Sequence, residues 1–217
     1  MPSRRLTELA LLRDAALVLC LPDVAVTVAM SYLHRAAAGE AASLDDITAS
    51  LFLSCKVCEC PRRIRDVINA LHIAQNEVAL LDSHEYWACK ERALLAEQLL
   101  LRSLGWNTAF TDRQVLCLQA LQHLTQDSDQ SLPQAMRELS IALLNDCAGD
   151  ATCERQPHRV LATAAIRLAA LFLELRLPGG WSRILEVEPD DDALDAVCHA
   201  MIDTYCDALG EPPALVM

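Results

Sequence analysis

The sequence predicts an all-α fold built from two similar units of five helices each. Apolar residues recur at helical spacing along nearly the whole chain, and no stretch shows the alternation of a β-strand. The expected helices also follow the same order in both halves, which indicates a repeated unit. Hydrophobic residues make up 53% of the chain but aromatic residues only 4%, so we expect a core of Leu, Ala and Val packed between helices.

In the first unit, expected at residues 1–106, capping and breaking residues set the helix boundaries. Ser43, with Asp46 three residues later, has the spacing of an N-terminal capping box. Pro61 is expected in the first turn of the fourth helix, where a missing N–H does no harm. The predicted helix ends include Pro22, Gly39 and Gly105. The predicted helices are 7–19, 24–38, a third capped by Ser43, 61–74 and 83–104.

The second unit, expected at residues 107–217, repeats this plan with weak sequence identity to the first. Three helices are followed by a short turn and a final helix. The predicted elements are 112–125, 132–148, 157–175, the turn 181–185, and 190–209.

Composition excludes several classes of function. A net charge of −12 opposes a nucleic-acid-binding surface or an anionic membrane surface. The apolar run near the N-terminus resembles a signal peptide, but Arg13 and Asp14 interrupt it, and no charge-free stretch reaches membrane-spanning length. We therefore expect a soluble intracellular chain with reduced cysteines. No nucleophile–base set, phosphate loop or dinucleotide fingerprint is present, so we expect neither an enzyme nor a cofactor.

Three cysteines, Cys55, Cys58 and Cys60, lie within six positions and raise the question of a metal or redox site. On a helical wheel Cys55 and Cys58 share an apolar stripe with Ile47 and Leu51, as small core residues would. Cys60 precedes a proline, and we expect its sulfur to point elsewhere. A zinc site needs four ligands, and no second pair stands at a suitable distance. We predict core packing and no metal, with a metal or redox site as the less favoured alternative.

Two charged residues sit at unusual places in otherwise apolar helices. Lys56 is the charged residue of the third helix between Asp46 and Glu59, and Glu97 falls inside the apolar arc of the fifth helix. A buried carboxylate needs a cation or a backbone donor. The two residues form either a structural ion pair at the rim of the core or a pair turned toward a partner protein. Spacing alone favours the structural pair.

At these residues the sequence resembles a cyclin box. The run Leu53 to Glu59, "LSCKVCE", is similar to the end of the third helix of cyclins, although Cys58 replaces a glutamate. The run Pro61 to Asn69, "PRRIRDVIN", resembles that of L-type cyclins and, in part, cyclin Q. Trp181, Leu185 and Tyr205 resemble the ending of cyclins L, Q, K and T. The substrate-docking motif of cell-cycle cyclins is absent, which favours the transcription-associated branch.

The resemblance implies two tandem five-helix cyclin boxes and a regulatory subunit that forms a heterodimer with a cyclin-dependent protein kinase and activates it. The first box would bind the kinase, and the protein would act in the nucleus, with the cytoplasm as a second location, on transcription or pre-mRNA processing. Lys56 and Glu97 match the pair that holds helix C of the kinase, which turns the balance toward the partner-binding pair. The implied kinase-binding residues are Lys56, Glu97, Leu53, Val57, Leu101, Trp106 and Glu59.

Three further cations and one alternative function complete the expectations. Arg62, Arg63 and Arg65 stand at a helix start, where positive charge opposes the helix dipole, so we expect acidic groups of the kinase or nearby acids to balance them. The alternative function is a helical adaptor with a cyclin-like fold that activates no kinase. A DNA-binding relative of transcription factor IIB would need a basic face and a zinc ribbon, and the sequence shows neither.

Overall fold

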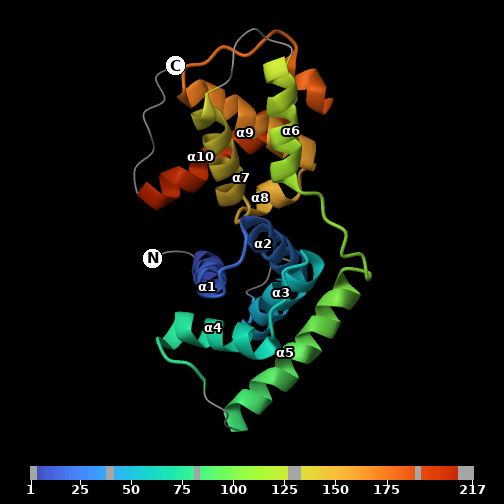
Figure 1. Cartoon of the computed structure of the whole chain (residues 1–217), viewed down its shortest axis with the longest axis vertical. Coiled ribbons are helices and arrows are strands. Elements are labelled where there is room, and N and C mark those ends of the chain that lie inside the picture. Colours follow the sequence, from blue (N-terminus) through green and yellow to red (C-terminus); the bar gives the residue numbers. More distant parts are fainter. Residues whose placement is uncertain (1–3, 38–41, 81–83, 127–132, 189–191, 210–217) are drawn as a thin grey trace. The chain divides into compact units, whose positions relative to one another are not determined.

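The computed structural model describes residues 4–37, 42–80, 84–126, 133–188 and 192–209, and across them the chain is helical with no strand. The all-α prediction is therefore confirmed. The chain divides into two compact units, Met1–Phe110 and Thr111–Met217, which we call unit 1 and unit 2 (Figure 1). No helix among the described residues is long and apolar enough to cross a membrane.

Unit 1 is organised around one central helix. It contains α1 (Arg4–Val18), α2 (Asp23–Ala37), α3 (Leu44–Val57), α4 (Ile64–Asn76) and α5 (His84–Ser103). α3 contacts all four of the others. Its side chains are buried on nearly every side, including Ala49, Leu51 and Cys55, because apolar or small residues occupy almost the whole helix. Because the middle of α3 is buried among the other helices, the position at which its last turn reaches the surface is fixed.

The ends of the unit 1 helices show one prediction confirmed and one wrong. Ser43 caps α3 as predicted: its Oγ accepts a hydrogen bond from the Asp46 N–H, and Asp46 Oδ2 accepts one from the Ser43 N–H. Pro61 does not open α4, which begins at Ile64 after the N-cap Arg63. The turn that closes α3 extends as far as Cys60, whose N–H donates to Cys55 O, so the fourth helix cannot begin at once.

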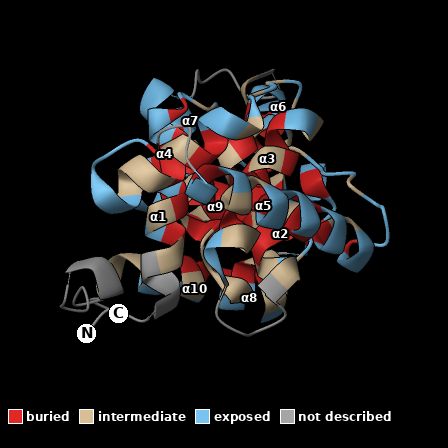
Figure 2. Ribbon diagram, turned by 90° about the horizontal axis from the view of Figure 1, so that it is seen from below, coloured by how far each residue is buried: buried red, intermediate tan, exposed pale blue. Residues whose placement is uncertain are grey.

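Unit 2 also packs around one helix. It contains α6 (Arg113–Gln126), α7 (Gln134–Cys147), α8 (Ala151–Glu154), α9 (His158–Phe172), the 3-10 helix η1 (Trp181–Leu185) and α10 (Asp192–Leu209). α9 contacts α6, α7, α10 and η1, and most of its residues are buried (Figure 2). α8 was not predicted. With four residues, α8 is too short to show a helical period of apolar residues. Its N-cap, Asp150, which accepts hydrogen bonds from the Thr152 and Cys153 N–H groups, is the only signal of this helix in the sequence.

Some predicted boundaries lie outside the described residues. These are the helix stop at Gly39, the start of the fifth helix at Ser83, and the starts at Leu132 and Asp190.

A buried ion pair joins two helices of unit 2. Arg113 on α6 donates through Nη2 to Glu154 Oε1 on α8 at 2.6 Å, and the two side chains are only 5% and 9% exposed. His158, at the start of α9, lies close enough to feel both charges. Burial lowers the pKa of His158, and the positive charge of Arg113 lowers it further. We therefore expect His158 to be neutral in the folded chain at pH 7.

The stability of the chain should fall at mildly acidic pH because of His158. As pH drops below the ordinary histidine pKa of about 6.5, the unfolded chain takes up this proton before the folded chain does, which favours unfolding. His158→Gln should therefore lose less unfolding free energy than the wild type between pH 7.5 and pH 5.5. Denaturant titrations at both pH values measure the difference. An equal loss in both proteins would show that His158 does not carry this dependence.

Candidate protein-interaction site

Lys56 and Glu97 meet where the last turn of α3 passes α5. Lys56 Nζ donates to Glu97 Oε1 at 2.6 Å, across 41 residues of sequence. Glu97 is 8% exposed, whereas the Lys56 side chain remains 45% exposed. Because Lys56 lies in the last turn of α3, its charge also faces the negative end of the helix dipole. The pair thus holds a buried carboxylate with a cation that still reaches solvent.

The Lys56 side chain is held from a second direction by an aromatic ring. Its Nζ lies 3.9 Å from the centre of the Phe52 ring, one turn earlier on α3. Phe52 was not among the predicted site residues, although a spacing of four residues from Lys56 is typical of such a contact on a helix. Ring and carboxylate together restrict where the ammonium can point.

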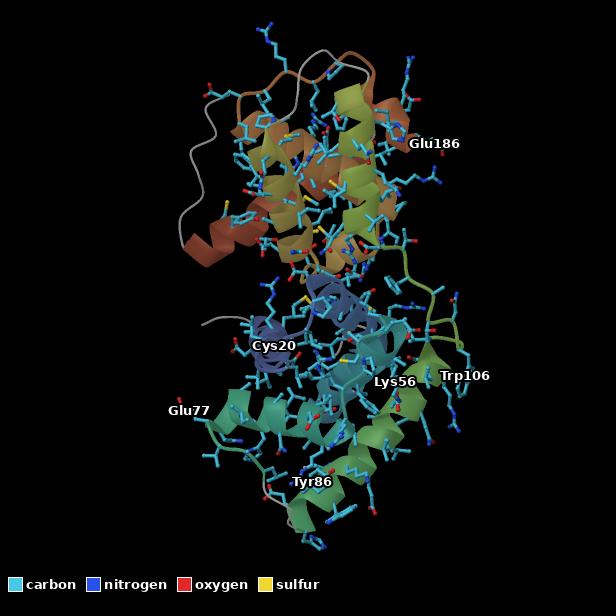
Figure 3. All side chains as sticks on the ribbon, viewed as in Figure 1. Cys20, Lys56, Glu77, Tyr86, Trp106 and Glu186 are labelled. Carbon is cyan, nitrogen blue, oxygen red and sulfur yellow. The ribbon has the colours of Figure 1, made fainter. Side chains whose placement is uncertain are left out.

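The apolar residues expected around the pair lie at different depths. Leu53 is 4% exposed and belongs to a core cluster of α2, α3 and α5, so it supports the surface from beneath. Val57 and Leu101 are half-buried at the edge of that cluster. Trp106, just beyond α5, is 68% exposed. We call Lys56, Val57, Glu97, Leu101 and Trp106 the α3–α5 face; Figure 3 labels Lys56 and Trp106.

The turn after α3 holds Glu59 and the cysteines. Glu59 is exposed, and its backbone is in the left-handed conformation, with φ +53°, at the position that closes α3. Cys55 is fully buried and Cys58 half-buried, in line with core packing. The expectation for Cys60 is wrong: its side chain lies close enough to Cys55 to raise the pKa of that thiol, because the turn brings residue 60 back over the helix end.

The Cys55 thiol is a poor metal ligand in this environment. Burial and, to a smaller extent, the neighbouring Cys60 raise the pKa of Cys55 to about 12, so the thiol stays protonated at pH 7. Among the described residues no group of three or more His, Cys, Asp or Glu side chains could hold a metal ion.

The three arginines after α3 have different surroundings. Arg62 is half-buried, and its guanidinium donates to Leu19 O at 3.1 Å and Cys20 O at 3.3 Å, at the end of α1. It also donates to the carbonyls of Cys60 and Pro61. Arg62 therefore ties the α3–α4 turn to α1 and offsets the negative end of that helix.

Arg63 and Arg65 remain on the surface. Arg63 is exposed and caps α4 without a side-chain hydrogen bond. Arg65 is exposed, with its guanidinium carbon 5.9 Å from the centre of the Tyr86 ring on α5. Unlike Arg62, these two cations are exposed and form no ion pair with the described residues.

Comparison with known proteins confirms the similarity to cyclins L and T. Cyclin-L1 of Gallus gallus is 28% identical over 211 residues, covering 93% of this chain and 39% of the relative. Cyclin-L2 of Homo sapiens is 27% identical with 93% and 40% covered, and Cyclin-T1-3 of Oryza sativa subsp. japonica is 26% identical with 93% and 43% covered. The chain thus spans about two fifths of the length of these relatives. No family model matches it.

A solved structure shares the fold. A chain of the yeast RNA Pol II CTD kinase CTDK-1 complex superposes with a TM-score of 0.79 at 16% identity, covering 98% of this chain and 71% of that chain. With the cyclin relatives, this likeness confirms the expected fold of two tandem cyclin boxes.

Arg62 and Arg63 should differ sharply in their effect on stability. Arg62→Gln should lower the free energy of unfolding by about 1–3 kcal/mol, because the carbonyls at the end of α1 lose a charged donor. Arg63→Gln is the matched control, since Arg63 is exposed, and should change stability by no more than about 0.5 kcal/mol. Denaturant unfolding measures both. Equal effects of the two substitutions would contradict a bracing role for Arg62.

Proposed function

We propose that the chain is a regulatory, cyclin-type subunit that binds a cyclin-dependent protein kinase through the α3–α5 face of unit 1 and activates it. The observation that carries this proposal is the geometry of the Lys56–Glu97 pair. A lysine ammonium has three donors, and within the described residues Lys56 uses one hydrogen bond, to Glu97. Its other N–H donors form no hydrogen bond with the described residues, and because the side chain is 45% exposed, backbone carbonyls of a partner can accept from them.

A purely structural ion pair explains less of what surrounds it. Burial of Glu97 does require a cation, and Lys56 supplies one. That role does not account for a tryptophan 68% exposed on the same face, nor for the half-buried Val57 and Leu101 beside the pair. An exposed aromatic and aliphatic patch next to a partly open charge pair is the composition of a protein-binding hot spot.

A comparison of the two central helices supports an interaction through unit 1. α9 is the central helix of unit 2, as α3 is of unit 1, but its last turn carries no basic residue. Instead that turn ends in Leu171 and Phe172, which are 65% and 58% exposed. Unit 2 therefore lacks the cation that the proposed kinase contact needs at the corresponding helix end.

In this function the chain performs no chemistry and acts by shifting a conformational equilibrium. The kinase must turn its helix C inward so that a glutamate pairs with the catalytic lysine. Moving an equilibrium from mostly inactive to mostly active requires roughly 5.5 kcal/mol of preferential binding. The apolar residues of the α3–α5 face would supply most of this, and Lys56 and Glu97 would fix the register of the contact.

The cellular process in which the chain acts is inferred from its similarity to known proteins. Cyclins L and T are the relatives in sequence, and the structural neighbour comes from a kinase complex of the RNA polymerase II C-terminal domain. We accordingly propose that its kinase partner acts in the nucleus on transcription or pre-mRNA processing.

Single substitutions in the pair should abolish most kinase binding. Lys56→Ala and Glu97→Ala each leave the other charge unpaired, so each should weaken binding by roughly 2–5 kcal/mol. The measurements are circular dichroism to establish helical folding, then the affinity and activity of the kinase.

A second ion pair between the same two helices provides the control. Arg92 on α5 pairs with Asp45 on α3 at 3.1 Å, and at 100° per residue Arg92 lies about 140° around α5 from Glu97. Arg92→Ala should leave kinase binding unchanged. Folded Lys56→Ala and Glu97→Ala proteins that activate the kinase fully would refute the assignment. Binding without any rise in kinase activity would instead leave the chain as a helical adaptor.

A further inference from the structure

Trp106 combines two unfavourable features at one residue. Its backbone is left-handed, with φ +61°, a conformation that is strained for a bulky side chain. Its side chain is also 68% exposed, so burial of the indole does not offset that strain. A residue held in such a state must be fixed by its surroundings.

The end of α5 differs from comparable helix ends in this chain. Four helices, α1, α3, α5 and α9, close with the same two backbone hydrogen bonds. The first residue past each cap is left-handed, and these residues are Cys20, Glu59, Gly105 and Glu174. Among these four described ends, the next residue is left-handed as well only after α5, where it is Trp106. The second left-handed residue is therefore not part of the ordinary closure.

Three further hydrogen bonds hold the segment after Trp106. The Asn107 N–H donates to Leu104 O at 3.1 Å, and the Ala109 N–H donates to Asn107 Oδ1 at 3.1 Å. The third bond comes from far away in sequence: Tyr32 Oη on α2 donates to Thr108 O at 2.9 Å, across 76 residues. This hydroxyl connects the segment to the body of unit 1.

Tyr32 is well suited to act as a fixed anchor. It is 1% exposed and packs in the same core cluster as Leu53, Leu100 and Leu104, so its ring has little freedom to move. Burial raises the pKa of Tyr32 to about 12, so the hydroxyl keeps its proton and donates throughout the physiological range.

We propose that Tyr32 is a positioning residue that holds residues 106–110 so that Trp106 is presented, already in place, to an apolar pocket of the kinase. This rests on the proposed function, which assigns Trp106 to the α3–α5 face. An aromatic anchor that is ordered before binding loses less conformational entropy when it docks, and tryptophan is among the residues that dominate binding hot spots. Tyr32 touches no partner itself and acts through the segment that carries Trp106.

The first experiment tests the clamp in the free chain. Tyr32→Phe removes only the hydroxyl, and amide hydrogen exchange should then speed up at Trp106, Asn107 and Ala109 but not along α3. Tyr205→Phe is the control, because it removes a similar hydroxyl bond, to Asp146 at 2.8 Å in unit 2. It should leave exchange in this segment unchanged.

A second variant guards against a general loss of folding in Tyr32→Phe. Asn107→Ala replaces an exposed side chain, so it leaves the core intact, and it should speed exchange at Ala109 as well. Unchanged exchange at all three amides in both variants would overturn the clamp.

The second experiment asks whether Tyr32 acts through Trp106. Tyr32→Phe should weaken kinase binding by roughly three- to tenfold in the wild-type background. In a Trp106→Ala background it should cause no further loss, because the anchor is already gone. The same loss in both backgrounds would show that Tyr32 acts by another route, and no loss in the wild-type background would also overturn the proposal.

If the proposed function is wrong, the binding data for the Lys56 and Trp106 variants will differ from those expected if only the Tyr32 proposal is wrong. If Lys56→Ala and Trp106→Ala both bind the kinase like the wild type, the α3–α5 face is not the kinase site and the role of Tyr32 in kinase binding falls with it. The exchange data would then still decide whether Tyr32 holds the segment. If Lys56→Ala binds poorly but Trp106→Ala binds normally, the α3–α5 face remains supported as the kinase-binding surface, and the anchor role of Trp106 is wrong.

Discussion

The packing of α3 among the other helices of unit 1 is the constraint on which the rest of the unit depends. A helix surrounded on all sides must be apolar or small nearly all round, and Ala49, Leu51 and Cys55 meet that requirement at 1% exposure or less. Even the buried Ser54 satisfies its hydroxyl locally, by donating to Leu51 O. Only the two ends of the helix reach the surface, so its charged residues lie there: Asp45 and Asp46 in the first turn and Lys56 in the last. Glu97 on α5 balances the charge of Lys56.

The same constraint has a different outcome in unit 2. α9 is equally buried, and much of it is alanine, which allows close approach of α6, α7 and α10. Its charge balance is internal: Arg113 and Glu154 are both buried against each other, away from solvent. A fully buried pair of this kind can fix the packing of helices but offers no donor to a partner. The two units therefore differ in where their charge pairs lie: partly open to solvent in unit 1 and buried in unit 2.

Sequence reasoning succeeded where the signal is local. The Ser43–Asp46 capping box and the stop at Gly105 depend on a few neighbouring residues, and helical periodicity reveals the central helices. The anomalous charges in α3 and α5 also pointed to two residues that the structure brings together.

What the sequence did not show depends on contacts between distant segments. The bond from Tyr32 to Thr108 joins positions 76 residues apart, and Arg62 reaches carbonyls 42 and 43 residues away. Neither contact has a periodic or motif signal, since any tyrosine or arginine could have made it. α8 is too short for periodicity, and Cys60 was misplaced because the turn after α3 depends on a left-handed Glu59, a conformation more typical of glycine.

The central claim is that the α3–α5 face receives the kinase. The most direct measurement is amide hydrogen exchange of the purified complex between this chain and a cyclin-dependent kinase, compared with the free chain. The account predicts new protection in residues 53–60 and 97–107, at the end of α3 and the second half of α5, with α7 and α9 unchanged. New protection confined to unit 2, with both segments of unit 1 exchanging as in the free chain, would contradict it.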